Sequence, residues 1–202
     1  MADGDSRPAR PDADFRLLRR EDFASLALWF GEPHVAQWWN PDATLEGIEA
    51  KYGPRIDGVD AATTMWIIEI GGEAAGLAQH YRHADHPAHD AAVGIAQAVG
   101  IDYLLSKAYA ARGLGGHVLS TFAGFVLERV PEALSCVATP AQANRRSWRA
   151  LEAAGFVQRG TCQPPGEPPA YTYALARSDL VERALEGHQR GVDLGRRSGP
   201  AG

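Results

Sequence analysis

A glycine-rich turn at residues 111–117, Ala-Arg-Gly-Leu-Gly-Gly-His, separates an apolar segment from an amphipathic one. We expect a helix to begin at Gly113, and the first backbone N–H groups of a helix have no intrahelical partner and lie at the positive end of its dipole. Glycines leave room for a pyrophosphate to approach these amides, and Arg112 and His117 could add positive charge. Glycines at this spacing also serve ordinary tight turns, and the segment is neither a Walker loop nor a complete GxGxxG fingerprint. The turn is therefore a candidate anion site.

One carboxylate, that of Asp102, interrupts the apolar run at residues 99–105. An Asp within such a run is costly in free energy unless it is solvated in a cleft, paired or functional. In a cleft, the carboxylate could attract an ammonium group and accept its proton, directly or through water, when the nitrogen acts as a nucleophile. The structural alternative is a partly exposed Asp at the end of a strand.

Upstream of this run, histidines recur at every third position from residue 80 to residue 89, at His80, His83, His86 and His89. Two acids, Asp85 and Asp90, lie among or beside them. The pattern raises the hypothesis of a metal-binding module. We expect no metal, because Pro87 interrupts any helix that could gather the rings and His80 falls in a strand. We expect loop residues or substrate-contact residues that titrate near neutrality.

The composition is ordinary for one globular domain, with 202 residues, 45% hydrophobic residues and a formal net charge of −5. The basic residues are scattered, so the continuous basic surface that a nucleic-acid partner needs is missing. The acidic excess could draw a cationic ligand toward a cleft, or form an ordinary solvated surface. No apolar run is long enough for a membrane span, and the polar N-terminus is unlike a signal peptide, so we expect a cytoplasmic protein. Cys136 and Cys162 are expected to be free thiols.

The elements that must position these residues follow from periodicity and turn signals. We expect one domain at residues 14–187 between disordered tails at 1–13 and 188–202, because the tails hold almost no large apolar residues. Strands are expected at residues 15–18, 64–70, 75–81, 99–105, 134–139, 156–160 and 171–176. Helices are expected at 22–30, from a Thr44 cap to Gly53-Pro54, from Gly113 to Pro131 and at 144–154, with an aromatic loop at 34–41. The fold class is α/β with a mixed sheet.

The glycine-rich turn and a later segment together resemble motifs A and B of the GNAT superfamily of N-acetyltransferases. The later segment reads Asn-Arg-Arg-Ser-Trp-Arg-Ala-Leu-Glu-Ala-Ala-Gly-Phe at residues 144–156. The resemblance implies the GNAT acyl-CoA N-acyltransferase fold, a central and mostly antiparallel sheet with a splayed pair of parallel strands and flanking helices. It also implies acetyl-CoA as cosubstrate, bound by Tyr103, Leu104, Ala111, Arg112, Gly113, Leu114, Gly115, Gly116, His117 and Asn144.

Within that family, the turn cradles the CoA pyrophosphate and the preceding strand holds the pantetheine arm through its backbone. By likeness, Asn144 contacts the cofactor; it is an equally good helix N-cap, and both roles stay open. Ala110 departs from the Gln or Arg that usually opens motif A. We expect little effect, because backbone amides do most of the binding.

Over residues 15–177 the chain further resembles the aminoglycoside 6′-N-acetyltransferases. The resemblance is carried by His-Val-Ala-Gln-Trp-Trp at 34–39, Gly-Leu-Ala-Gln-His-Tyr at 76–81, Gly-Ile-Asp at 100–102 and Pro-Pro-Ala-Tyr at 168–171. By that likeness, Asp102 is the general base for attack of an amine on a thioester. A cleft for a polycationic amine would be lined by Trp38, Trp39, Gln79, Tyr81, Asp85, Asp90 and Glu167. The alternatives are that the acids are plain loop residues and that one tryptophan fills the core.

Two positions depart from that pattern. Leu151 stands where some relatives carry a Tyr that protonates the departing sulfur, and Thr139 stands where they carry a cleft Asp. The expected function is acetyl-CoA-dependent acetylation of the 6′-amine of aminoglycosides in a ternary complex, which gives antibiotic resistance, by a monomer or homodimer. The alternatives are acylation of a lysine- or hydroxylysine-type amine in siderophore assembly, protein N-acetylation, and a non-catalytic CoA-binding sensor.

Overall fold

The computed structural model describes residues 11–39 and 42–182, and it divides them into two compact units. Unit 1 holds the described residues of Met1–Asp60 together with Thr64–Ala78 and Tyr103–Gly113. Unit 2 holds Ala61–Thr63, Gln79–Asp102 and the described residues of Leu114–Gly202. The strands are β1 (Ala13–Leu17), β2 (Thr63–Ile70), β3 (Glu73–Arg82), β4 (Ala98–Leu105), β5 (Ser135–Ala138), β6 (Val157–Cys162) and β7 (Ala170–Ala176). The α-helices are α1 (Phe23–Phe30), α2 (Pro33–Trp39), α3 (Leu45–Ile56), α4 (Pro87–Val93), α5 (Lys107–Ala110), α6 (Gly115–Arg129) and α7 (Arg145–Ala154), with 3-10 turns η1 (Arg20–Asp22) and η2 (His83–Asp85).

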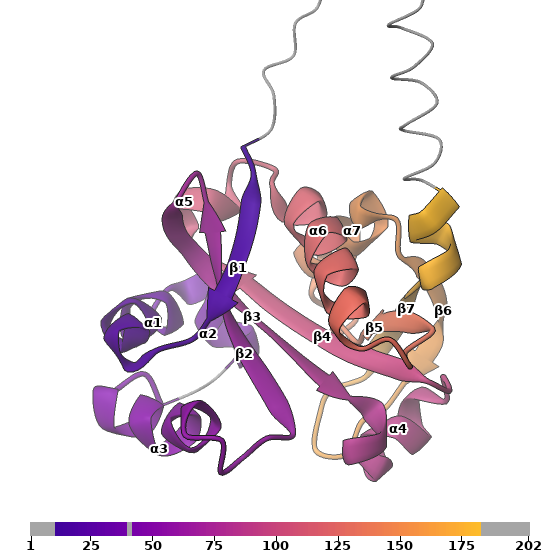
Figure 1. The fold of residues 1–202 in the computed structure, drawn as a ribbon, viewed down its shortest axis with the longest axis horizontal. Helices are drawn as coiled ribbons and strands as arrows, with labels where there is room; N and C mark the ends of the chain where they lie inside the picture. The colour runs from indigo at the N-terminus through magenta and orange to yellow at the C-terminus, as the bar shows by residue number, and fades with distance from the viewer. Residues whose placement is uncertain (1–10, 40–41, 183–202) are drawn as a thin grey trace, which may run out of the picture. The chain divides into compact units, whose positions relative to one another are not determined.

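The strands pair in the order β1-β2-β3-β4-β5-β7-β6, which makes the mixed sheet that the sequence predicts (Figure 1). β4 and β5 are parallel, whereas β1 and β2, β5 and β7, and β6 and β7 are antiparallel. The parallel pairing runs from Ala98↔Ser135 to Gly100↔Val137, although β4 continues to Leu105. The two strands therefore separate after Gly100, which is the splayed pair expected of the fold.

Unit 1 packs α1, α2 and α3 around an apolar core. The predicted face of α1 is buried, with Phe23, Leu26 and Phe30 in this core. The prediction of a loop at 34–41 is wrong over its described residues up to Trp39, because α2 starts at Pro33; proline is compatible with the first turn of a helix, where its missing N–H would have no partner. α3 is capped by the Thr44 side chain as predicted, but it continues through Pro54 to Ile56.

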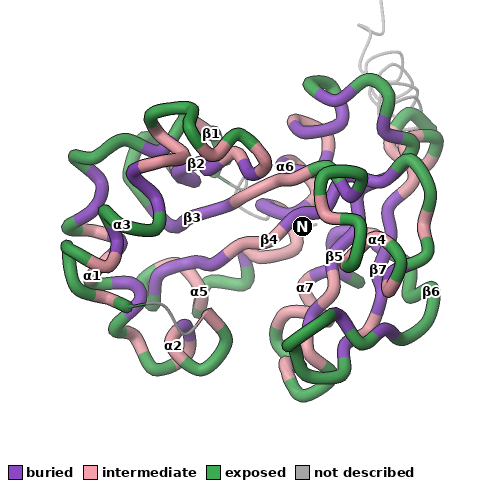
Figure 2. The backbone as a smooth tube through the Cα atoms, turned by 90° about the horizontal axis from the view of Figure 1, so that it is seen from below, coloured by how far each residue is buried: buried purple, intermediate pink, exposed green. Residues whose placement is uncertain are grey.

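Unit 2 packs α6 and α7 as neighbours and contains an unexpected helix, α4. The predicted loop over the histidines is wrong in its second half, because Pro87 begins α4 and does not break it; Gly94, at φ 67°, ends it. β6 is exposed along its length except at Cys162, in contrast to the buried β5 (Figure 2). β1 takes in Ala13, the last residue of the expected N-terminal tail, and residues 1–10 and 183–202 lie outside the described part of the chain.

Candidate active site

Asp102 is joined to Gln79 across neighbouring strands of unit 2. The Gln79 Nε2 donates a hydrogen bond to Asp102 Oδ2 at 2.8 Å. Because side chains alternate along a strand, Gly100 and Asp102 share one face of β4, and Gln79 and Tyr81 share one face of β3. The amide of Gln79 thereby fixes the orientation of the carboxylate that the sequence analysis singled out.

The environment of Asp102 makes its carboxylate a stronger base than an ordinary Asp. Desolvation raises the pKa of Asp102, and this effect outweighs the hydrogen bond from Gln79 and the charge of His89, which both lower it. A raised pKa brings a carboxylate closer to the operating pH, where proton acceptance is most efficient. The arrangement suits a group that takes a proton from a substrate.

Tyr81 packs its ring directly on Gly100. A Cβ added at Gly100 would lie 2.3 Å from Tyr81 Cε2, so only glycine leaves room for the ring. Gly100 belongs to the Gly-Ile-Asp motif, but the motif gives no sign of this packing role. Desolvation, followed by the charge of Asp102, raises the pKa of the Tyr81 hydroxyl, so this hydroxyl stays protonated at neutral pH.

Three of the four histidines surround the Tyr81 ring. His83 stacks on it with ring centroids 5.9 Å apart, and His86 and His89 meet it edge-on at 5.1 and 5.8 Å. His89 also meets His83 edge-on at 5.3 Å. His80 directly precedes Tyr81 on β3, so its side chain points to the other face of the strand. Desolvation, followed by the charges of Arg129 and Arg82, lowers the pKa of His80 to about 4.

The three acids expected beside a cation lie in different surroundings. Asp85 is exposed, and Asp90 Oδ1 lies 3.5 Å from His83 Nδ1. Glu167 is exposed as a residue, but partial desolvation of its carboxyl and then the charge of Asp102 raise its pKa. Of these acids, Glu167 is the one whose charge is coupled to Asp102.

The two expected sugar-stacking tryptophans, both in unit 1, differ in exposure. Trp39 packs against the core of unit 1 and stacks on Phe30 at 6.0 Å, which is the alternative that the sequence analysis left open. Trp38 is 37% exposed. Trp38 is therefore the one with a ring available to a ligand.

The glycine-rich turn has one glycine that faces open space and one that packs. α6 begins at Gly115, later than predicted, because the short α5 and a turn precede it. Gly113 has φ +70° and open space where a Cβ would lie. A Cβ at Gly116 would lie 2.8 Å from the Cβ of Ala153, so Gly116 serves the contact between α6 and α7. Leu114 is buried as well.

The remaining cofactor candidates have structural contacts of their own. Ala111 and Arg112 are exposed, and the Arg112 guanidinium lies 4.7 Å from the centre of the Tyr109 ring. Leu104 belongs to the core of unit 1, and Tyr103 is partly buried beside it on β4. His117, in the first turn of α6, has a buried Nε2 without a partner among the described residues.

Asn144 is the N-cap of α7. Its Oδ1 accepts a hydrogen bond from the Ser147 backbone N–H at 3.2 Å, and Gly155 ends the helix in the left-handed conformation. The capping role that the sequence left open is therefore present. A cofactor contact by Asn144 stays a prediction.

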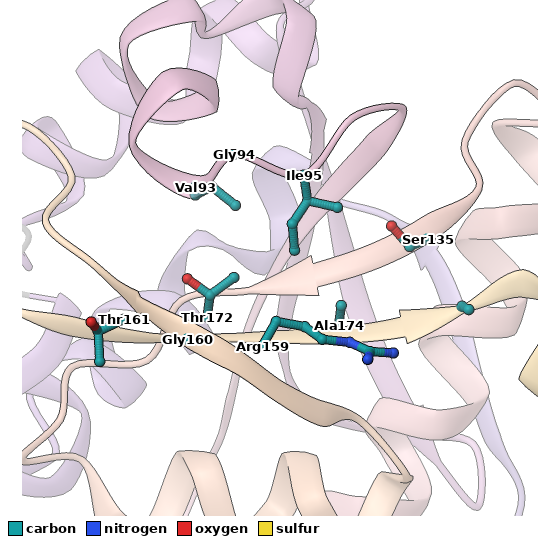
Figure 3. Close-up of a pocket in the computed structure, with 10 residues that line it drawn as sticks. Val93, Gly94, Ile95, Ser135, Arg159, Gly160, Thr161, Thr172 and Ala174 are labelled. Carbon is teal, nitrogen blue, oxygen red and sulfur yellow. The ribbon is translucent and has the colours of Figure 1, made fainter.

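A pocket of about 410 Å³ lies elsewhere in unit 2, between the end of α4 and strands β5, β6 and β7. Figure 3 shows Ile95 pointing toward the strands and the Arg159 side chain lying along them. None of the residues predicted for the cofactor or the substrate lines it.

Over residues 11–39 and 42–182, no group of three or more His, Cys, Asp or Glu side chains could hold a metal ion. None of the described helices is long and apolar enough to cross a membrane.

The family model "Acetyltransferase (GNAT) domain" matches residues 19–163. The chain belongs to this GNAT acetyltransferase family. The family and the mixed sheet, in which β4 and β5 are the parallel pair among the described strands, confirm the predicted resemblance and fold class. A search of curated proteins gives no match.

Solved GNAT structures give a finer comparison. Aminoglycoside acetyltransferase AAC(6')-Ib in complex with coenzyme A is 27% identical, with a TM-score of 0.72 over 85% of this chain and 98% of that one. AAC(6')-Ib with coenzyme A and kanamycin is 28% identical, with a TM-score of 0.71 over 85% and 98% of the two chains. Spermidine N-acetyltransferase from Vibrio cholerae, in complex with CoA and spermine, is 14% identical with a TM-score of 0.64 over 84% and 98%, a likeness of fold alone.

Proposed function

We propose that this GNAT protein transfers the acetyl group of acetyl-CoA to the 6′-amino group of an aminoglycoside. The observation that carries the proposal is Asp102, partly desolvated, oriented by Gln79 and placed just beyond the point where β4 leaves β5. Support for the substrate class comes from AAC(6')-Ib, whose structures hold coenzyme A with kanamycin or with ribostamycin. Such a transfer would inactivate the antibiotic and so protect the host.

The described residues fit coenzyme A at two places. The N-terminus of α6 has no side-chain cap, and Gly113 before it is exposed with open space beside its Cα, which suits a pyrophosphate on the helix amides. Tyr103 and Leu104 lie on β4 beyond its pairing with β5, so the β5-side backbone groups of this segment suit the pantetheine amides. Arg112 adds a cation, and the cosubstrate supplies an acetyl thioester.

The chemistry asked of the protein is to bind an ammonium and remove a proton from it. The Asp102 carboxylate attracts the ammonium group and accepts its proton, directly or through water. The neutral nitrogen then attacks the thioester carbonyl and the C–N bond forms. The nitrogen loses its second proton as the C–S bond breaks, and that proton passes through water to the sulfur. Leu151 is buried and has no proton to donate, so water protonates the departing sulfur. A thiolate with an ordinary pKa near 8.5 leaves without a dedicated acid.

A lysine- or hydroxylysine-type amine is the second candidate acceptor. The observation in its favour is the distribution of acids: Asp85 is exposed and Asp90 lies beside His83, which leaves Glu167 as the carboxylate coupled to Asp102. A polycation with several ammonium groups needs more acids than an amine with one or two charges.

The test is release of free thiol by the purified protein from acetyl-CoA in the presence of a panel of aminoglycosides, polyamines, lysine derivatives and peptides. We expect turnover with kanamycin-type aminoglycosides and acetylation at the 6′-nitrogen, read by NMR of the product. Absence of turnover with every aminoglycoside would refute the proposal. Turnover confined to lysine derivatives would establish the second candidate.

A further inference from the structure

Each turnover of an amine acetyltransferase leaves a proton to be removed. An ammonium substrate loses two protons as it becomes an amide; one ends on the sulfur of coenzyme A and the other must leave the site. Asp102 holds that second proton only transiently, because it must be a carboxylate again for the next substrate. The described residues of unit 2 contain groups that could take the proton onward from Asp102.

The histidine cluster extends from the Asp102 side of unit 2 toward solvent. The Tyr81 ring packs on Gly100, which shares a face of β4 with Asp102, and His89 meets that ring edge-on at 5.8 Å. The charge of His89 accordingly lowers the pKa of the Asp102 and Glu167 carboxyls. His89 meets His83 edge-on at 5.3 Å, and His83 is 2% exposed. Beyond it, Asp90 Oδ1 lies 3.5 Å from His83 Nδ1, and the Asp90 side chain is 43% exposed. The groups are therefore arranged in sequence from the reacting end to the surface.

Four imidazole nitrogens of this cluster are buried, and apart from the 3.5 Å approach of Asp90 Oδ1 to His83 Nδ1 no described residue engages them. Both ring nitrogens of His83 and the Nε2 of His86 and of His89 have no hydrogen-bond partner among them. Buried polar atoms in folded proteins nearly always have a partner, and an ordered water is the usual one where protein groups do not reach. A neutral imidazole offers one donor and one acceptor, so alternating waters and imidazoles can pass a proton without burying a lasting charge.

We propose that His89 and His83 form a proton-exit path that carries the proton of each turnover from Asp102 to Asp90 at the surface. The path rests on the proposed acetyl transfer to an amine, whichever amine that is. In this path, His89 and His83 act on the reaction through Asp102 and need not touch the substrate. Tyr81 holds the path in place, because its ring packs on Gly100 and touches all three histidines of the cluster. Among the described residues, the other ionisable groups near the path include Glu167, coupled to Asp102, Cys162, whose charge raises the pKa of Tyr81, and His86, whose charge lowers the pKa of His83.

Chemical rescue tests the path. His89→Ala should lower kcat by about 10²-fold in dilute buffer, the lower end of what a positioned proton transfer contributes, with KM little changed. Free imidazole should restore much of the lost rate by occupying the vacated space. His86→Ala is the matched control, since it removes a ring with the same edge-on contact to Tyr81 but outside the path, and its kcat should neither fall comparably nor respond to imidazole. Asp90→Asn should slow turnover in dilute buffer and recover in concentrated buffer.

The outcomes separate this inference from the proposed function. The kinetics are run with whichever amine the wild-type protein acetylates, so failure with aminoglycosides leaves the test of the path intact. An unchanged kcat in His89→Ala, a loss that imidazole does not restore, or a rise confined to KM would each overturn the path. An activity-independent arm follows the Asp102 carboxyl by ¹³C NMR: its pKa should rise in His89→Ala and stay in place in His86→Ala. Equal titration of Asp102 in the wild type and His89→Ala would overturn it as well.

Discussion

Replacement of Asp102 by Asn separates its chemistry from its structural contact. Asn keeps an oxygen that can accept the 2.8 Å hydrogen bond from Gln79 Nε2, so the local geometry should survive. It removes the negative charge and the basic lone pair. Loss of a general base costs about 10²- to 10⁴-fold in rate, which corresponds to about 3–5 kcal/mol in activation free energy. We therefore expect kcat/KM of D102N to fall by at least about 10²-fold with the best amine.

D102N should lose activity but should be at least as stable as the wild-type protein near pH 7. Desolvation raises the pKa of Asp102 in the folded protein above its ordinary value, so the charged carboxylate at neutral pH disfavours folding, and the wild-type protein gains stability as the pH falls through that raised pKa. Asn removes this cost. We expect D102N to unfold at the same temperature as the wild type or higher near pH 7, with the difference shrinking in acid.

The assay for both effects is thiol release from acetyl-CoA together with thermal unfolding at several pH values. Asp14→Asn, on the exposed side of β1, is the matched control and should change neither. Turnover by D102N within about threefold of the wild type would refute the assignment of Asp102 as base, given the size expected for general-base catalysis. A clear loss of stability near pH 7 would refute the desolvation argument.

Substitutions at three further positions test individual contacts of the fold. Gly100→Ala places a Cβ 2.3 Å from the Tyr81 ring and should lower stability by about 1–3 kcal/mol in denaturant titration, and an unchanged midpoint would contradict the packing of Tyr81 on β4. Asn144→Ala should cost about 1 kcal/mol of stability by loss of the α7 cap, whereas Asn144→Ser keeps a capping oxygen. Calorimetry should find weaker CoA binding in both variants, and unchanged binding in Asn144→Ser would leave Asn144 as a cap alone. Arg177→Ala removes a guanidinium that donates to four carbonyl oxygens at the end of α6 and in the turn after it, at 2.8 to 3.4 Å. The loss should cost about 1–3 kcal/mol in thermal unfolding with unchanged kcat, and a lowered kcat would contradict a purely structural role.

The sheet could be predicted from the sequence because local patterns decide it. Apolar runs and turn signals gave each strand within a few residues, and Gly155 marked the end of α7 through its left-handed conformation. Motif spacing gave the family, since the glycine turn and the segment from Asn144 occur together.

Helix α4, which contains His89, was not predicted from the sequence because Pro87 was interpreted as a helix breaker. Pro87 has the opposite effect at the first position of α4, and Asp90 in the first turn was a signal for a helix start that could have been used. The partners of individual side chains were equally out of reach, because they depend on tertiary contacts. Nothing in the sequence says that Trp39 packs inward while Trp38 stays partly exposed, or that Asp90 lies beside His83.

The most direct test of the central claim is a crystal structure of the protein with coenzyme A and an amine that it acetylates. We predict the pyrophosphate on the backbone amides between Gly113 and the first turn of α6, and the acceptor nitrogen within hydrogen-bonding reach of Asp102, directly or through one water. A pyrophosphate bound away from that turn, or an acceptor nitrogen remote from Asp102, would contradict the mechanism.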